Sequence, residues 1–200
     1  MDKEYHLTAY SFHANNTSLL QLLEENRKVR HDNNAKTIRL LEADNPGVDY
    51  SNYERYQYER NRGGWKSLNY LLDQKLIRDI PGYSDLLDRL GNKLIFTDPE
   101  TIINAVNRAQ GVSFLAHPNA YFHGISLPTE QLQKWIDFGI SGIECYSSYP
   151  GILKAEDYVS FCKKNDLLIS GGSDCHGTFI STKLGNPRIT LDMLNMGSLL

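Results

Sequence analysis

The chain has 200 residues, 40% of them apolar and 22% charged, a composition typical of a globular protein with a sizeable core. Its formal net charge of −3 argues against a protein that binds the phosphate backbone of duplex nucleic acid. The three cysteines form no CxxC pair, no apolar run approaches the roughly 18 residues of a membrane span, and the opening MDKEYHLTAY lacks the apolar region of a signal peptide. We therefore expect a cytoplasmic protein without membrane association.

The first part of the chain combines one short strand with a long helical region. Residues 4–12, EYHLTAYSF, carry the aromatic residues and Thr that strands favour. Leu and Ile then recur at helical spacing behind a cap at Asn16 or Thr17, and a second amphipathic helix is predicted from Trp65 to Leu76. We interpret residues 15–94 as a helical insertion into a domain made of the remaining segments, 1–14 and 95–200.

Strands and helices alternate after Phe96. Thr97 is the expected cap of a helix that starts with Pro99 and Glu100. The apolar runs predict strands, and the amphipathic stretches between them predict helices; the strands fall at 112–116, 142–146 and 167–170, and the helices near 130–138 and 155–164. This alternation predicts an α/β fold with a parallel sheet that forms part of a barrel.

Polar side chains follow the ends of the predicted strands. His117 comes directly after VSFLA, Glu144 lies near the end of GIECY, and Asp174 and His176 follow LLIS. In parallel α/β folds, reactive groups gather at the carboxyl ends of the strands. Asp174 and His176 would share one face if their backbone is extended, and His6 in the first strand is a further candidate. Such imidazole and carboxylate groups suit Zn, Mn or Fe, whereas the alternative for SDCH is a turn capped by the aspartate.

Three motifs resemble the later part of the polymerase-and-histidinol-phosphatase (PHP) family of metal-dependent phosphoesterases: LAHP at 115–118, GIECY at 142–146 and GGSDCHG at 171–177. EYHLTAY resembles a family strand that carries a histidine. RGGW at 62–65 resembles a helical insertion found in one branch, which hydrolyses nucleotide or short-oligonucleotide phosphates. The resemblance covers nearly the whole chain.

The resemblance implies a partial, distorted (β/α)7 TIM-like barrel with divalent metal ions (Mn, Zn or Fe) at its carboxyl rim. It places His6, His117, Asp174 and His176 on metal-ligand positions. Glu144 matches a rim position that hydrogen-bonds the strand end instead of binding metal.

Two basic residues of the insertion, Arg62 and Lys66, stand where the family's insertion approaches a substrate phosphate. A guanidinium suits this role because it binds phosphate oxygens in a bidentate manner. The alternative interpretation is a solvated, charged loop. We therefore assign Arg62 and Lys66 as the candidate catalytic residues.

The sequence departs from the family at its start, because the family's first strand bears a His-x-His pair and no two histidines here are two residues apart. We read the chain as the later part of a PHP domain: a natural fragment, a shortened form, or one of two separate chains. A barrel without its first strands would leave an exposed sheet edge. We therefore expect the chain to form a homodimer through this edge, to swap elements or to be only marginally stable.

The expected function is metal-dependent hydrolysis of a small phosphomonoester or of a nucleotide or oligonucleotide phosphate. Bound metal would polarise a phosphoryl oxygen and lower the pKa of a bridging water. The alternative is a catalytically incomplete fragment, which acts as a metal- or phosphate-binding module or needs a partner chain. A third reading is a structural α/β domain without a metal site.

Overall fold

A computed structural model describes residues 4–178 and 180–199 of the chain. The contacts divide the chain into two compact units. The first unit comprises Met1–Leu23, Thr97–Cys175 and Thr182–Leu200, and the second comprises Glu24–Phe96 and His176–Ser181. Each unit has its own hydrophobic core.

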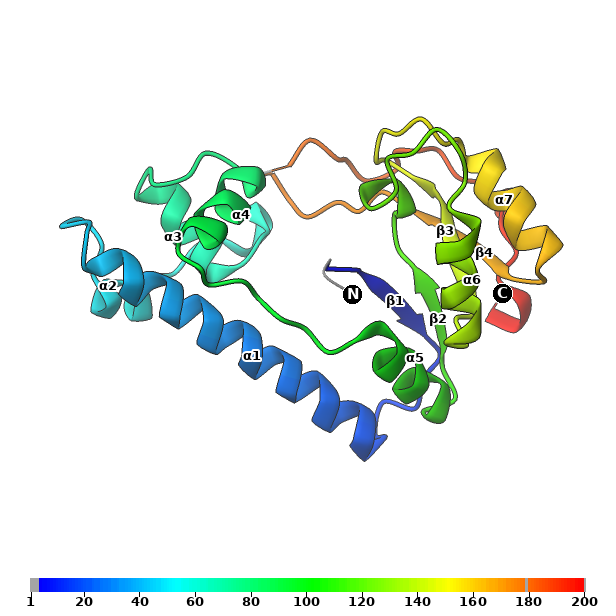
Figure 1. Ribbon diagram of the computed structural model, residues 1–200, viewed down its shortest axis with the longest axis horizontal. Helices are drawn as coiled ribbons and strands as arrows, with labels where there is room; N and C mark the ends of the chain where they lie inside the picture. The colour runs from blue at the N-terminus through cyan, green and yellow to red at the C-terminus, as the bar shows by residue number, and fades with distance from the viewer. Residues whose placement is uncertain (1–3, 179, 200) are drawn as a thin grey trace. The chain divides into compact units, whose positions relative to one another are not determined.

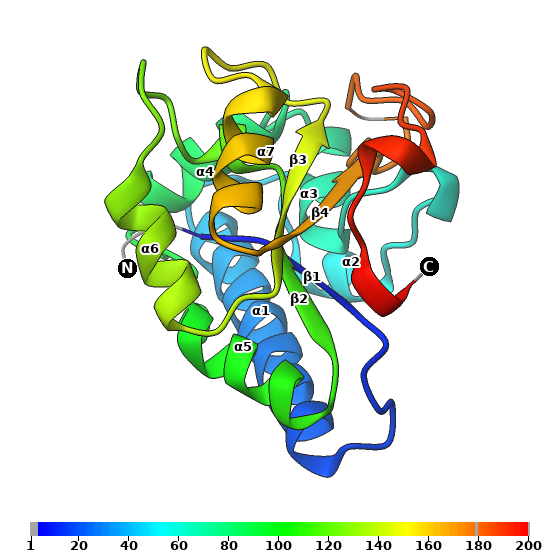
Figure 2. The ribbon, with the colours of Figure 1, turned by 90° about the vertical axis from the view of Figure 1, so that its right-hand side faces the viewer.

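The first unit is built on a four-stranded sheet with the order β1-β2-β3-β4 (Figure 2). The strands are β1 (Leu7–Tyr10), β2 (Val112–Leu115), β3 (Gly142–Ser147) and β4 (Leu168–Gly172). The three later strands are parallel, so the predicted α/β fold is confirmed for this part.

Strand β1 departs from the predicted parallel arrangement, because it runs antiparallel to β2. The long helical region between these two strands replaces the single crossover helix of a βαβ unit. The constraint that makes neighbouring strands parallel therefore does not apply to β1.

Three helices of this unit follow the predicted alternation. They are α5 (Pro99–Arg108), α6 (Thr129–Asp137) and α7 (Ala155–Lys164), and α7 lies against β3 and β4 (Figure 1). The cap of α5 is Asp98, whose carboxylate accepts the Thr101 N–H at 3.0 Å, and not Thr97 as predicted.

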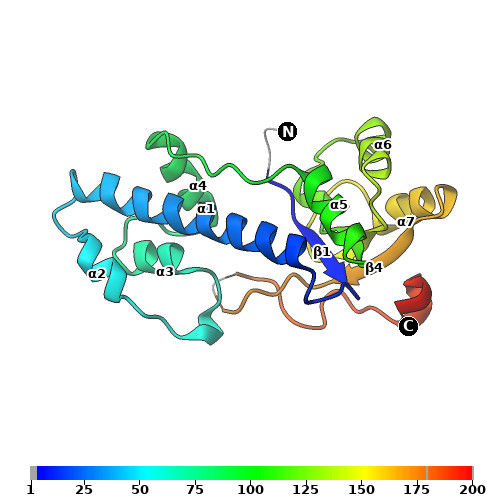
Figure 3. The same ribbon diagram turned by 90° about the horizontal axis from the view of Figure 1, so that it is seen from below.

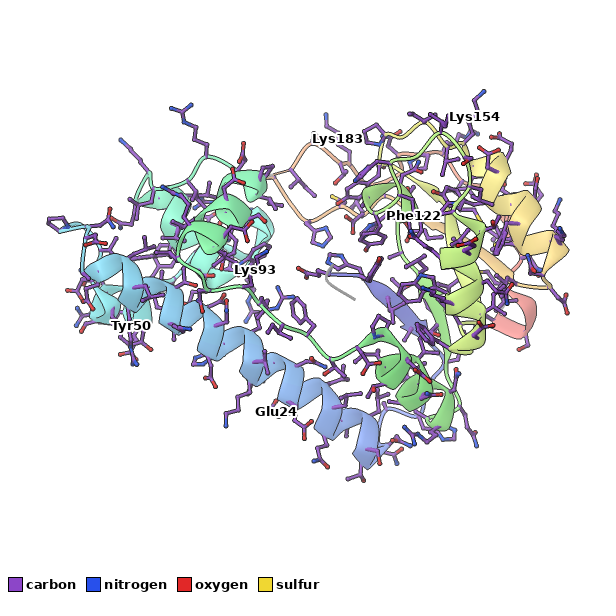
Figure 4. All side chains as sticks on the ribbon, viewed as in Figure 1. Glu24, Tyr50, Lys93, Phe122, Lys154 and Lys183 are labelled. Carbon is purple, nitrogen blue, oxygen red and sulfur yellow. The ribbon has the colours of Figure 1, made fainter. Side chains whose placement is uncertain are left out.

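The core of the first unit gathers large apolar side chains from these helices and from the strands. Phe122, labelled in Figure 4, is part of it. Its largest fully buried members are Ile103, Leu115, Leu132, Trp135, Ile143 and Tyr158. Short 3₁₀ turns complete the unit at Pro118–Ala120 (η2), Leu191–Met193 (η3) and Gly197–Leu199 (η4). This packing fixes the strand ends from which the candidate site is built.

The second unit is helical. Its elements are α2 (Tyr50–Arg55), η1 (Arg60–Arg62), α3 (Lys66–Asp73) and α4 (Ile80–Arg89), packed around a core that includes Ile38, Leu68, Tyr70, Leu71 and Leu86. The predicted helix from Trp65 to Leu76 is confirmed in shorter form as α3, and its N-terminal turn follows Gly63 and Gly64.

The longest helix is α1 (Thr17–Glu42), which Figure 3 shows along its whole length. Asn16 caps it by accepting the Leu19 N–H at 3.0 Å, as expected for one of the two predicted caps. Several of its apolar residues are exposed, Leu20, Leu23 and Val29 among them, so helical spacing alone overestimates its buried face. No helix in residues 4–178 and 180–199 is both long and apolar enough to cross a bilayer.

Candidate metal-binding site

The site begins with two histidines that the antiparallel pair β1–β2 brings together. His6 precedes β1 and is not inside the strand as predicted, while His117 follows β2. The start of β1 lies opposite the end of β2, and the Ala116 N–H donates to the His6 carbonyl at 3.1 Å. As a result His6 Nδ1 lies 3.1 Å from His117 Nε2. Two ring nitrogens this close share either a proton or a cation between them.

His117 is held in an unusual backbone conformation. Its φ of 29° is positive, a region that costs a non-glycine residue of order 1–3 kcal/mol and persists only where the surroundings enforce it. Its side chain is 3% exposed, and its backbone N–H donates to the carboxylate of Glu144 on β3. Glu144 thus hydrogen-bonds the end of the neighbouring strand β2, in line with the rim role predicted for it.

The pKa of Glu144 is raised to about 7, chiefly by burial and to a smaller extent by the nearby Asp174 carboxylate, while the His117 N–H opposes the rise. One of its oxygens, Oε1, is buried without a hydrogen-bond partner among the described residues. Glu144 is therefore a buried carboxyl group close to His117 and Asp174.

Asp174 brings a carboxylate to the same place. Its Oδ1 lies 4.0 Å from His117 Nε2, and its Oδ2 accepts a hydrogen bond of 2.9 Å from the Tyr149 hydroxyl. The ring of Tyr149 stacks on the His117 imidazole with centroids 4.7 Å apart. Burial, followed by the hydrogen bond to Asp174, raises the pKa of Tyr149 to about 12, so its hydroxyl is a stable donor at neutral pH. Tyr149 therefore contacts both candidate ligands.

Tyr121 and Glu4 hold His6. The Tyr121 hydroxyl accepts the His6 backbone N–H at 2.7 Å, and Glu4 Oε1 lies 3.3 Å from His6 Nε2. The carboxylate faces the ring nitrogen that points away from His117, an arrangement that orients imidazole ligands in metal sites. His6 itself is half exposed, with 49% of its side-chain surface accessible.

The donor types suit a transition metal, and the histidine pair also has a suitable spacing. Two nitrogen ligands of a tetrahedral Zn²⁺ lie about 3.4 Å apart, because each bond is about 2.1 Å long. The observed 3.1 Å between His6 and His117 is close to this value. The separation from Asp174 is wider, and within residues 4–178 and 180–199 no three His, Cys, Asp or Glu side chains are arranged to hold a metal ion. The residues thus supply two correctly spaced ligands and a carboxylate beside them.

The fourth predicted ligand, His176, belongs to the second unit and is exposed. The extended backbone that would place Asp174 and His176 on one face is not observed, because β4 ends at Gly172 and Asp174 has a φ of 48°. The structure therefore brings together His6, His117 and Asp174 within the first unit, and the role of His176 stays a prediction.

Arg62 and Lys66, the predicted phosphate ligands, make local contacts in the second unit. Arg62 forms an ion pair of 2.8 Å with Asp73, and the Lys66 ammonium donates to the Glu54 carbonyl at 2.7 Å. Lys66 also lies 5.1 Å from the ring centroid of Tyr53. Their role in phosphate binding stays a prediction, and the contacts show what holds each side chain in place.

The sequence analysis missed Tyr149 and Tyr121. Tyr149 lies two residues beyond the end of β3 at Ser147, so the same strand-end argument that selected His117 points to it. Tyr121 follows the 3₁₀ turn after His117, and its contact with His6 depends on the antiparallel pairing that the sequence did not predict.

Comparison with solved structures shows where this fold occurs elsewhere. A proposed metal-dependent phosphoesterase from Bifidobacterium adolescentis matches with a TM-score of 0.71 and 22% sequence identity, over 92% of this chain and 67% of that one. An amidohydrolase from Chromobacterium violaceum, solved with bound sulfate and no metal, matches with a TM-score of 0.63 and 19% identity, over 86% of this chain and 63% of that one. The sequence matches no family model and no curated protein.

The chain therefore has the α/β fold shared by a proposed metal-dependent phosphoesterase and an amidohydrolase, and spans about two thirds of the length of each. At these identities the comparison establishes the fold.

Proposed function

We propose that the protein is a metal-dependent phosphoesterase that hydrolyses a small phosphomonoester or the phosphate of a nucleotide or short oligonucleotide. The observation that carries the proposal is the meeting of His6, His117 and Asp174, two imidazoles and a carboxylate from separate segments, at one end of the sheet. The resemblance of the motifs to the PHP family and the fold shared with a proposed phosphoesterase support it. We also propose that the sheet forms part of a distorted TIM-like barrel.

His6, His117 and Asp174 would hold the divalent ion, Mn, Zn or Fe, and His176 is the proposed further ligand. Such an ion supplies Lewis-acid polarisation of a phosphoryl oxygen and a water of lowered pKa. Neutral imidazole nitrogens and a carboxylate are the ligands these metals prefer.

The surrounding residues orient these donors. Tyr149 donates to Oδ2 of Asp174 and thereby directs the other carboxylate oxygen toward His117. Glu144 accepts the His117 backbone N–H and supports the strained turn that presents the imidazole. A substrate phosphate would meet Arg62 or Lys66, whose positive charge would balance that of the phosphate.

Phosphate release tests the proposal. The purified chain with added Mn²⁺ is assayed on nucleoside monophosphates, sugar phosphates and short oligonucleotides. We expect release that requires the metal and that His117→Ala lowers by roughly 100-fold or more, since both metal binding and the charge on the reacting oxygen depend on this ligand. His31→Ala, at an exposed helix position with 70% of its side chain accessible, is the matched control and should retain activity. Equal activity of wild type and His117→Ala would contradict the proposal.

A second candidate function is a metal- or phosphate-binding module that needs a partner chain for turnover. The wide spacing between His117 and Asp174, and the lack of a three-ligand cluster in the described part of the chain, favour it. Near-stoichiometric metal binding without phosphate release would support this candidate over the enzyme.

A further inference from the structure

The second unit contains a close backbone contact between two segments that are far apart in the sequence. The loop 61–63 consists of the last two residues of the 3₁₀ turn η1 and of Gly63, which ends that turn. The segment 176–178 includes the predicted ligand His176, and both segments belong to this unit. The Thr178 N–H donates to the Arg62 carbonyl at 3.1 Å. This hydrogen bond joins the insertion directly to the segment that begins with His176.

Two glycines allow the backbones to approach this closely. A Cβ at Gly63 would overlap the carbonyl oxygen of His176. A Cβ at Gly177 would lie 2.5 Å from the Arg62 carbonyl oxygen and 2.7 Å from that of Asn61. Both glycines also have positive φ, 78° and 94°, which disfavours other residues independently of space. The two segments thus fit together only as long as neither position carries a side chain.

The loop is in turn fixed to helix α3. The Arg62 guanidinium pairs with Asp73 at 2.8 Å, and Asp73 also accepts the Tyr56 hydroxyl at 2.5 Å. The side chain of Asn69, which is completely buried, donates to the Gly63 carbonyl at 2.8 Å. Side-chain contacts therefore hold the loop from α3, while its backbone contacts the His176 segment.

We propose that the loop 61–63 sets the backbone position of His176, with Gly63 and Gly177 as positioning residues for this ligand. The inference rests on the proposed function, in which His176 binds the metal. The helical insertion would then position a metal ligand, in addition to any contact that it makes with substrate. Arg62 would also have a second role, because its side chain anchors the loop and its carbonyl holds the segment.

The test compares Gly63→Ala with Gly91→Ala. Gly91 lies in the same unit and has a positive φ of 59°, but a Cβ there has nothing within 4 Å. Gly185→Ala is a second control, since its φ of 78° equals that of Gly63 and its surroundings are also open. Only Gly63→Ala combines the backbone strain with a collision against His176.

Two properties are measured: amide hydrogen exchange at Thr178, and the affinity for Zn²⁺ by titration. In the wild type and in both controls we expect a protected Thr178 amide and unchanged affinity. In Gly63→Ala we expect the protection to be lost and the affinity to fall by about 10- to 100-fold, the range seen when groups that orient metal ligands are removed. Protection and affinity equal to wild type in Gly63→Ala would overturn the inference.

Gly177→Ala replaces Gly63→Ala if the latter does not fold, and the same outcomes apply to it. An unprotected Thr178 amide in the wild type would overturn the inference without any variant. If the wild type binds no Zn²⁺, the proposed function fails. In that case hydrogen exchange at the Thr178 amide still tests whether the loop 61–63 holds the His176 segment. Slower exchange in wild type than in Gly63→Ala would support this contact, and equal exchange in the two proteins would contradict it.

Discussion

His117 is the central residue of the candidate site, because it contacts several of the other site residues. Its ring contacts His6 and Tyr149, its backbone donates to Glu144, and its positive φ is retained against a steric cost. Backbone strain that is stabilised by several surrounding groups is characteristic of functional positions. These contacts explain why an imidazole stands at the end of an otherwise apolar strand.

Tyr149 offers a test at the level of one hydroxyl group. Tyr149→Phe keeps the ring that stacks on His117 but removes the hydrogen bond to Asp174. We expect the affinity for Mn²⁺ or Zn²⁺ to fall by about tenfold, because the carboxylate loses the donor that orients it. Titration calorimetry measures the change, with Tyr10→Phe on the exposed part of β1 as the control. Equal affinity in Tyr149→Phe and wild type would contradict the role of the Tyr149 hydroxyl in orienting Asp174 for metal binding.

Asp73 makes the second unit sensitive to acid. Hydrogen bonds from Tyr56 and then from Arg62 hold the pKa of Asp73 below its ordinary value of 3.8. In acid the unfolded chain therefore binds more protons at this residue than the folded chain. The contribution to stability is complete above the unfolded pKa and is lost as the pH falls through the folded pKa.

We thus expect the urea midpoint of the wild type to decrease as the pH is lowered from about 5 toward 3, and this decrease to be smaller in Asp73→Asn. The effect is modest because 43% of the Asp73 side chain is exposed to solvent. Identical pH profiles for the two proteins would contradict the assigned hydrogen bonds.

At the level of the elements, local patterns predicted most of the helices and strands. Local sequence was sufficient to predict these elements, because an apolar run or an amphipathic stretch is visible in neighbouring residues. This applies to the strands β2, β3 and β4 and to the helices α5 and α7. The direction of β1 depends on the path of the chain through the whole helical region, which no local pattern records. The left-handed backbone of Asp174 was missed for a related reason, since an extended conformation was assumed beyond the end of β4.

The residue that caps the N-terminus of α5 differs between the sequence-based prediction and the structure. The sequence predicted Thr97, but Asp98 accepts the Thr101 N–H. We expect Asp98→Ala to lower the free energy of unfolding by about 1 kcal/mol, as is usual for loss of an N-cap, and Thr97→Ala to cost less. Urea denaturation of both variants measures the difference. A larger loss for Thr97→Ala would favour the original prediction.

Strand β1 forms one end of the sheet, and the predicted homodimer would use this edge. In an antiparallel pair of strands, every second residue directs its backbone N–H and C=O toward the partner strand. The His6 carbonyl accepts a hydrogen bond from β2's side and Thr8 follows two residues later, so the N–H of Ala9 points away from β2. Ala9→Pro removes this outward N–H and leaves the bonds to β2 in place. We expect sedimentation velocity to show a dimer for wild type and a monomer for Ala9→Pro. A wild-type monomer at all concentrations, or a dimer that Ala9→Pro does not change, would contradict the prediction.

At the level of the whole molecule, the chain passes between the two units after Leu23, Phe96, Cys175 and Ser181. One of these crossings separates Asp174 from His176, two ligands that the sequence analysis treated as a pair. The sequence placed them side by side in a motif, but the unit to which each belongs follows from tertiary contacts such as the hydrogen bond between Thr178 and Arg62.

Metal stoichiometry is the most direct measurement of the central claim, that His6, His117 and Asp174 bind a divalent cation together. Wild type and His117→Ala are equilibrated with Mn²⁺ or Zn²⁺, dialysed, and analysed for metal by elemental analysis, with His31→Ala as the control. We expect at least about one equivalent of metal in wild type and in the control, and little in His117→Ala. Equal metal content in wild type and His117→Ala, or none in either, would contradict the claim.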